Sequence, residues 1–216
     1  GVGADTMSGG LGADVYTVDD LGDSVIETTG AGIDTVTSTI GFTLSVDLEK
    51  LTLSGTAAID GTGNASANSL TGNAADNHLI GLAGNDTLSG GAGDDVLAGG
   101  FGADSLIGGA GADTFYFDVF ETAANRDAIR DFEHTIDHVA IDRGAFSAFA
   151  FDPAGALDPL ALAFGAAATT SAEHLVYNAS TGGLFYDADG VGGAAQVQIA
   201  VFTTKPVLDA WDFLLV

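Results

Sequence analysis

The chain has 216 residues and a formal net charge of −25, with five Lys or Arg residues against 30 Asp or Glu residues. This charge argues against nucleic acid as a partner, because phosphates repel it, and it makes a metal-free chain repel itself. The absence of cysteine excludes disulfides and thiol chemistry, and no apolar stretch is long enough to span a membrane.

Two glycine-rich units open the chain within residues 1–17. GVGADTMS carries Asp5 and Met7, and GGLGADVYT carries Gly10, Gly12, Asp14 and Tyr16. Residue 1 already lies inside a unit, with no initiator Met or signal segment before it. We therefore expect a fragment of a longer protein, in which the turns of Asp5 and Asp14 lack their partner turns.

Residues 18–62 alternate β-branched and polar side chains between glycines, which predicts short strands joined by turns. The segment forms either spacer coils between repeat runs or a small separate domain, and both are all-β. Its turns carry four acidic residues that either bind extra calcium or are solvated. Because no repeat fixes their geometry, we expect them to be solvated: Asp19, Asp20, Asp23 and Asp34.

Residues 63–117 have a nine-residue period. Two weaker units, GNASANSLT and GNAADNHLI, are followed by GLAGNDTLS, GGAGDDVLA, GGFGADSLI and GGAGADTFY. The four regular units have Gly at the fourth position, Asp at the sixth and an apolar residue at the eighth. Their carboxylates are Asp86, Asp95, Asp104 and Asp113. In the weaker units Asn68 and Asn77 stand at the Asp position. Because their amide oxygen is neutral, we expect these coils to cap the roll or to bind a metal ion weakly.

The period can be interpreted physically. Glycine-rich stretches adopt turns because glycine accepts positive φ, and three residues with one inward apolar side chain form a minimal strand. Two units make one coil, so Asp86 lies over Asp104 and Asp95 over Asp113. Coils stacked about 4.8 Å apart bring oxygens to both sides of a cation that binds oxygen at about 2.4 Å. Oxygen ligands without Cys favour Ca²⁺.

These units resemble the nonapeptide G-G-x-G-x-D-x-U-x of the RTX (repeats-in-toxin) family. The resemblance implies an all-β parallel β-roll, a calcium-binding β-solenoid with a C-terminal β-rich capping module, that holds several Ca²⁺ ions. A glycine-turn array without metal would leave stacked carboxylates to repel each other. The implied ligand positions are Asp5, Gly10, Gly12, Asp14, Asn77, Gly81, Gly84, Asp86, Gly91, Gly93, Asp95, Gly100, Gly102, Asp104, Gly109, Gly111 and Asp113.

The period ends after Phe117, and residues 118–216 form a different module. Residues 126–142 resemble the D-x-I-x-D-F…D-x-I segment that follows the last repeat in serralysin-like proteins. Where family members carry Gly, this chain has Glu133, His134 and Thr135. Its three acidic residues either cap the roll and bind calcium or form salt bridges to Arg126 and Arg130: Asp127, Asp131 and Asp137.

The rest of the module predicts one helix and three strands. LDPLALAFGAAA begins a short helix at Leu157, with Asp158 as N-cap and Pro159 at the first position. Residues 174–202 predict three strands with turns at 179–183 and 188–193, and resemble a segment common near RTX C-termini. Asp187 and Asp189 there form a weak calcium site or a polar turn.

No catalytic constellation is found. His134 and His138 are four residues apart, but the segment HTIDH lacks the Glu of the H-E-x-x-H motif of zinc proteases. Trp211 and the four tyrosines are expected in the core or at an edge. The tail LDAWDFLLV resembles that of proteins exported by type I secretion.

We therefore expect a non-enzymatic, secreted calcium-binding module that drives folding and type I export of a larger protein. The alternatives are a surface-layer or adhesin domain that binds cell-surface polysaccharide or self-assembles, and an accessory domain of an RTX protease, lipase or alginate epimerase. The predicted division is 1–17, 18–62, 63–117 and 118–216.

Overall fold

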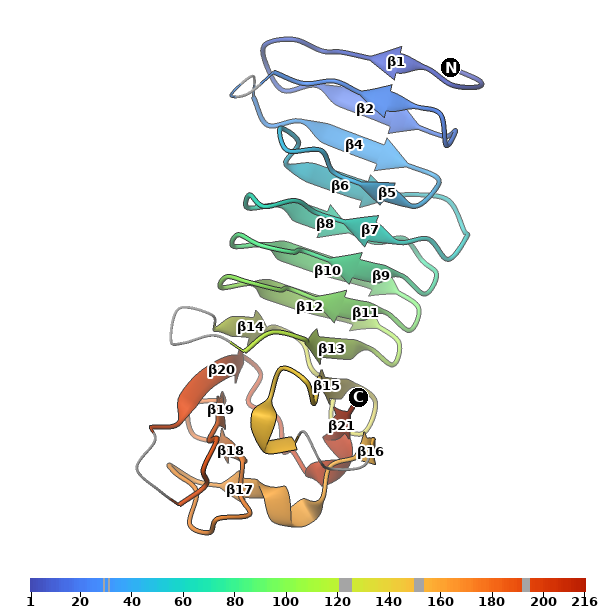
Figure 1. The fold of residues 1–216 in the computed structure, drawn as a ribbon. Helices are drawn as coiled ribbons and strands as arrows, with labels where there is room; N and C mark the ends of the chain where they lie inside the picture. Colours follow the sequence, from blue (N-terminus) through green and yellow to red (C-terminus); the bar gives the residue numbers. More distant parts are fainter. Residues whose placement is uncertain (29, 31, 121–125, 150–153, 192–194) are drawn as a thin grey trace.

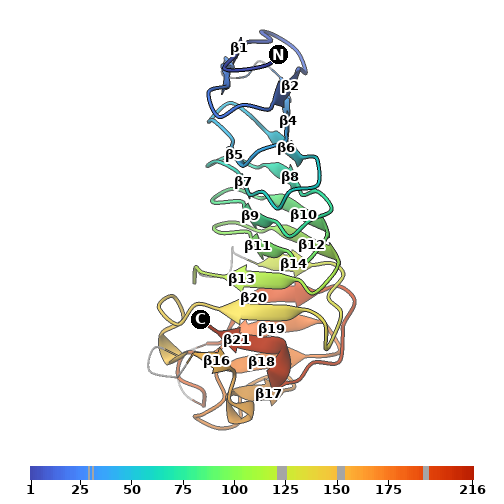
Figure 2. The same cartoon turned by 90° about the vertical axis from the view of Figure 1, so that its right-hand side faces the viewer.

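The computed structural model describes the chain except for residues 29, 31, 121–125, 150–153 and 192–194. A stack of coils, with the N-terminus at its outer end, leads into a wider C-terminal module (Figure 1). Strands lie on two sides of the stack, as the turned view shows (Figure 2). Within the described residues, no helix has both the length and the hydropathy needed to cross a membrane.

The larger sheet is parallel along the roll, and each of its strands pairs in register with a strand of the next coil. Its roll strands are β2 (Val15–Val18), β4 (Thr35–Ser38), β6 (Lys50–Leu53), β8 (Ser69–Thr71), β10 (Thr87–Ala92), β12 (Ser105–Ala110) and β14 (Asp127–Ile129). The spacer strands β4 and β6 lie between β2 and β8, so residues 18–62 continue the same sheet.

The second sheet lies on the opposite side of the coils. Its parallel strands are β5 (Phe42–Thr43), β7 (Gly61–Thr62), β9 (His78–Ile80), β11 (Val96–Ala98), β13 (Thr114–Phe117), β15 (His138–Ile141) and β21 (Phe213–Leu215). At the N-terminal end, β1 (Thr6–Met7) pairs with β3 (Ser24–Val25) in a separate two-stranded sheet. The predicted all-β parallel roll is thus confirmed.

Each repeat contributes one inward apolar side chain to a continuous core. The eighth positions of the regular units, Leu88, Leu97, Leu106 and Phe115, are fully buried. A buried Leu contributes about 1.5–3 kcal/mol, whereas ordering a backbone costs about 1–2 kcal/mol for each residue. A nine-residue unit with one Leu therefore needs further stabilisation, from ladder hydrogen bonds or from a bound ion.

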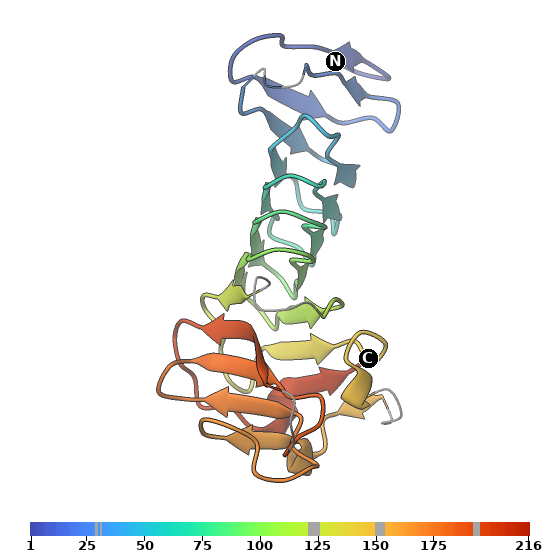
Figure 3. The ribbon, with the colours of Figure 1, turned by 60° about the vertical axis from the view of Figure 1, so that its left-hand side comes forward.

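The C-terminal module extends both sheets (Figure 3). Beyond β14 the larger sheet continues through β20 (Val197–Phe202), β19 (Gly183–Tyr186), β18 (Leu175–Asn178) and β17 (Leu162–Phe164). The predicted three strands of residues 174–202 are therefore present as β18 to β20, and residues 192 and 193 of the second predicted turn lie outside the described residues. In the second sheet β16 (Gly155–Ala156) pairs antiparallel with β21.

An aromatic chain joins the module to the roll. The ring of Phe132 lies 6.0 Å from that of Phe115, the last apolar residue of the repeats, and 5.1 Å from that of Phe202 on β20. Such pairs contribute about 0.5–1.5 kcal/mol beyond their burial. The open end of the roll is thereby covered by an apolar layer rather than left to solvent.

Two predictions for the module are wrong. The helix expected from Leu157 is a single 3₁₀ turn, η2 (Pro159–Ala161), capped by Asp158 as predicted but followed at once by β17. Pairing of β17 with β18 buries Leu162 and overrides the local helix preference. Trp211 is 73% exposed, because the 3₁₀ turn η3 (Ala210–Asp212) buries the residues on either side of it, Ala210 and Asp212, and leaves its own side chain on the outer face.

The turn at residues 133–135, which lacks the glycine of the family pattern, is held by side chains. Thr135 has a φ of 71°, and its backbone N–H donates to Asp212 Oδ1 over 3.4 Å. His134 Nδ1 lies 2.9 Å from the same oxygen. His134 therefore contacts a carboxylate from η3. A further 3₁₀ turn, η1 (Ser147–Phe149), packs Phe149 against the core.

Candidate calcium centre

Acidic and amide residues stand one above another along the roll, because each precedes an inward apolar residue by two positions and the coils stack in register. They form two columns. The first column contains Asp14, Asp34, Glu49, Asn68, Asp86, Asp104 and Asp127. The second contains Asn77, Asp95, Asp113 and Asp137, whereas Asp5 and Asp23 lie one above the other in the separate N-terminal sheet.

Hydrogen bonds connect the members of each column. The backbone N–H of Asp86 donates to Oδ1 of Asp104 over 2.7 Å, and that of Asp95 donates to Oδ1 of Asp113 over 2.9 Å. The same bond runs from Asp104 to Asp127. The structure thus brings together the two pairs that the nine-residue spacing predicts.

The second carboxylate oxygen of each repeat Asp has no partner. Asp86, Asp95, Asp104 and Asp113 are at most 2% exposed, and Oδ2 of each is buried without a hydrogen bond. Within the described part of the chain, no Lys or Arg side chain pairs with them. A buried charge without a partner is strongly destabilising, so a bound cation beside these oxygens would stabilise the folded chain.

Glycine at the first position of each unit leaves room beside the unpartnered oxygen. A Cβ on Gly81 would collide with Oδ2 of Asp86 and would lie 2.5 Å from the backbone oxygen of Gly99 in the next coil. On Gly90 a Cβ would collide with Oδ2 of Asp95 and lie 2.6 Å from the oxygen of Gly108. A carboxylate oxygen and a turn carbonyl therefore face one small space, and this donor set suits Ca²⁺, which binds oxygens at about 2.3–2.6 Å.

Burial shifts the titration of these carboxyls in the metal-free chain. Loss of solvation raises the pKa of Asp86 to about 7 and the pKa values of Asp95 and Asp113 to about 6. It raises the pKa of Asp127 to about 8, with a further contribution from the charge of Asp104. The site therefore disfavours its own negative charge until a cation or a proton neutralises it.

The two Asn positions are satisfied without an ion. Oδ1 of Asn77 accepts from the N–H of Asn73 over 2.8 Å, and its Nδ2 donates to the oxygen of Ile59 over 2.7 Å. Asn68 accepts in the same way from the N–H of Asn64 over 2.7 Å. Asn77, which the sequence places among the ligands, thus has its amide oxygen already occupied.

The N-terminal turns have partners, contrary to expectation. The N–H of Asp5 donates to Oδ1 of Asp23 over 2.9 Å, and that of Asp14 to Oδ1 of Asp34 over 2.8 Å. Asp34, expected in solvent, is 1% exposed. The missed signal is GAGIDTV, residues 30–36, which keeps G-x-G-x-D-x-apolar outside the nine-residue period. Gly32 packs on the oxygen of Gly12 so closely that no Cβ fits.

The acidic residues after the repeats continue the columns. Asp127 and Asp137 are 3% and 4% exposed, and Asp131 accepts from the N–H groups of Gly108 and Gly109. In the described residues neither Arg126 nor Arg130 forms an ion pair, so the salt-bridge alternative is wrong. Whether these residues bind calcium stays a prediction, as it does for Asp187 and Asp189.

Stacked parallel coils with unpartnered carboxylate oxygens over glycine turns define a calcium-binding β-roll. The family model "RTX calcium-binding nonapeptide repeat (4 copies)" matches residues 1–20, 62–97 and 89–119. The nonapeptide repeats predicted from the sequence are thus confirmed as RTX calcium-binding repeats over these residues.

Among solved structures, the chain is similar to the AlgE6R3 subunit from the Azotobacter vinelandii mannuronan C5-epimerase. The two are 27% identical with a TM-score of 0.44, over 68% of this chain and 77% of that one. No curated protein matched the chain.

Proposed function

We propose that the chain binds several Ca²⁺ ions between stacked turns and that these ions drive its folding. One observation carries the proposal: Oδ2 of Asp86, Asp95, Asp104 and Asp113 is buried without a partner beside a glycine-lined space. Each ion supplies two positive charges to a chain with a net charge of −25. Binding to the folded state alone couples calcium concentration to folding.

The glycine positions have a defined part in this proposal. Glycines at the second and fourth positions adopt positive φ, as Gly91 at 111° and Gly93 at 102° do. This conformation lets the turn fold back tightly, and the turn carbonyls then join the carboxylates as ligands. Asp86 with Asp104 and Asp95 with Asp113 supply the charge, while the turn supplies neutral oxygens.

Calcium-dependent folding would suit export. In the cytosol calcium is scarce, so a self-repelling chain stays unfolded and can thread a type I exporter. Outside the cell, at about millimolar concentration, sites of the extracellular affinity class fill and the roll closes. The C-terminal module, whose aromatic layer covers the end of the roll, would then provide the surface on which the first coil forms.

A calcium titration tests the proposal. Chelator-stripped protein is titrated with Ca²⁺ while circular dichroism and bound metal are measured. We expect a cooperative gain of β-structure with several ions bound to each chain, and Mg²⁺ at the same concentration serves as the control. A stripped chain that is already folded, with no response to calcium, would exclude it.

A further inference from the structure

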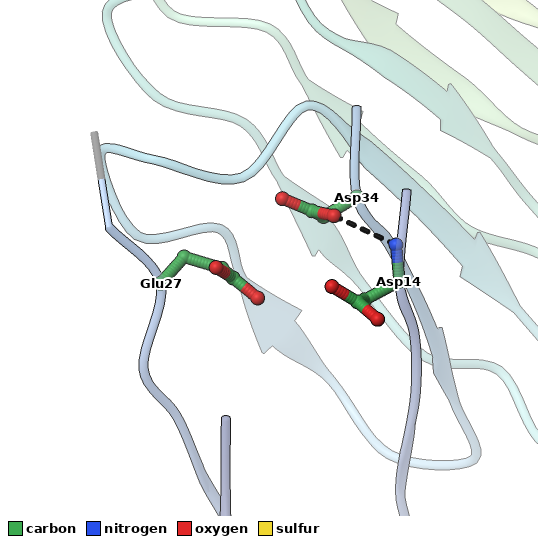
Figure 4. A group of neighbouring side chains, drawn as sticks. All are labelled: Asp14, Glu27 and Asp34. Atoms are coloured by element: carbon green, nitrogen blue, oxygen red, sulfur yellow. Dashed lines mark hydrogen bonds between the residues drawn. The ribbon is translucent and has the colours of Figure 1, made fainter. Parts of the chain in front are cut away.

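Three carboxylates converge where the first repeat meets the spacer. Asp14 directly precedes β2, Asp34 directly precedes its neighbour β4, and Glu27 follows β3. One oxygen from each lies within 4.8 Å of the other two. Figure 4 shows the three carboxylates turned toward a common centre.

Each member offers an oxygen that the protein leaves unused. Asp34 is 1% exposed, and its Oδ1 accepts from the N–H of Asp14 while its Oδ2 is buried without a partner. Oδ2 of Asp14 and Oε1 of Glu27 are likewise buried and unpartnered. Within the described residues none of the three forms a salt bridge.

The chemistry of this cluster selects a hard divalent cation. Three carboxylates this close together repel one another unless a positive charge lies between them. Two oxygens on opposite sides of one Ca²⁺ are about 4.8 Å apart, since each binds at about 2.4 Å. Because the three oxygens lie within 4.8 Å of one another, all three can bind the same ion.

We propose that Asp14, Glu27 and Asp34 bind one Ca²⁺ ion at a site that the nine-residue pattern does not describe. Glu27 and Asp34 belong to the spacer, outside the segments that the repeat family matches. The inference rests on the proposed calcium-dependent function but has its own ligands. The ion connects the segment after β3 to the first repeat. It thus stabilises the coils on the N-terminal side of Asn68 and Asn77, which themselves need no ion.

The test counts ions. Calcium-saturated wild-type chain and the variants Glu27→Gln, Asp34→Asn and Asp19→Asn are compared by equilibrium dialysis and metal analysis. Asp19→Asn is the matched control, because Asp19 is an exposed acid in the preceding turn and the charge change is the same. Both amide variants keep a side-chain oxygen as acceptor: Glu27 accepts from the N–H of Thr28, and Asp34 accepts from the N–H of Asp14.

We expect Glu27→Gln and Asp34→Asn each to bind one ion fewer than Asp19→Asn, with the circular dichroism of the calcium-saturated roll retained. Equal stoichiometry and affinity in all three variants would overturn the site. If Asp95→Asn loses an ion while Glu27→Gln loses none, only this site is refuted. If the wild-type chain binds no calcium, the proposed function fails as well.

Discussion

Residues 63–80 and 81–116 build coils of the same shape, but they satisfy the buried polar side chain at the sixth position in different ways. In both, a residue at the sixth position is buried beside a glycine of its own unit: Asn77 beside Gly72, and Asp95 beside Gly90. The Asn side chain satisfies itself with one N–H donor and one carbonyl acceptor. The Asp side chain keeps Oδ2 without a partner.

The second position of the unit accounts for this difference. Asn73 stands where the regular units have a residue with positive φ, either Leu82 or a glycine. Its N–H turns inward to Oδ1 of Asn77, while its own Oδ1 accepts from the N–H of Ala75. In the regular unit Gly91 adopts a φ of 111° and leaves Oδ2 of Asp95 open. The roll thus contains two kinds of coil. In the closed coils, residues 63–80, hydrogen bonds satisfy the side chain at the sixth position. In the open coils, residues 81–116, the carboxylate at that position needs an ion.

The largest expected effect comes from placing a carboxylate in a closed coil. Asn77→Asp replaces the Nδ2 donor by an oxygen that faces the carbonyl oxygen of Ile59. An uncompensated buried charge costs about 3–5 kcal/mol. At a calcium concentration just sufficient to fold the wild-type chain, this variant should be unfolded by circular dichroism.

Asn85→Asp is the control for that change, because it adds the same charge at an exposed position of a neighbouring turn. Its side-chain oxygen still accepts from the N–H of Ala103. Equal folding of the two variants would show that Asn77 is not needed to neutralise its coil.

The converse change removes a ligand from an open coil. Asp95→Asn keeps an acceptor for the N–H of Asn77 but removes the charge beside Gly90. We expect the calcium midpoint of folding to rise more than the roughly 10- to 100-fold that loss of an outer-sphere partner costs. Asp94→Asn, exposed and adjacent, should leave the midpoint nearly unchanged in the same titration. Equal shifts would contradict the assigned register.

Protons should replace calcium in the open coils. The folded-state pKa values of Asp86 and Asp95 are raised by burial, to about 7 and about 6, so the metal-free fold binds protons more tightly than the unfolded chain does. Its stability is then greatest below the unfolded pKa and is lost as pH rises through about 6–7.

Circular dichroism of calcium-stripped chain at pH 5 and pH 7.5 measures this effect. We expect more β-structure at pH 5 and a calcium affinity that is severalfold weaker there. The closed coils contribute nothing to the change, because Asn does not titrate. A stripped chain with more β-structure at pH 7.5 would reverse the sign and refute the argument.

The regular units were predictable from sequence, because the nine-residue period determines which strands pair and which residue of each unit faces the metal site. Leu88 and Asp86 recur at fixed spacing, so the pairs and the core follow from stacking alone. The buried position of Asp34 beside Asp14 was not predicted, since the spacer lengthens the coil and moves the GAGIDTV unit out of the nine-residue period. Glu27 has no motif at all, and only the three-dimensional path of the segment brings it to Asp14.

Other differences arose where tertiary contacts override local preference. The segment after Pro159 has helix-forming residues, yet strand pairing with β18 decides its conformation. The amide network of Asn77 could not be read from sequence, because the donor from Asn73 becomes visible only when the turn is formed.

The smallest expected effect concerns a single strained residue in the first open coil. Leu82 has a φ of 78° at the position where the later units have glycine, and its side chain is 45% exposed. A non-glycine residue in the left-handed region costs about 1–2 kcal/mol, and little packing is lost on its removal. Leu82→Gly should therefore raise the free energy of unfolding by about 1 kcal/mol in urea at saturating calcium. Ala92→Gly, in β10, should lower it by about 0.5–1 kcal/mol. A loss of stability in both variants would mean that the turn does not need positive φ at residue 82.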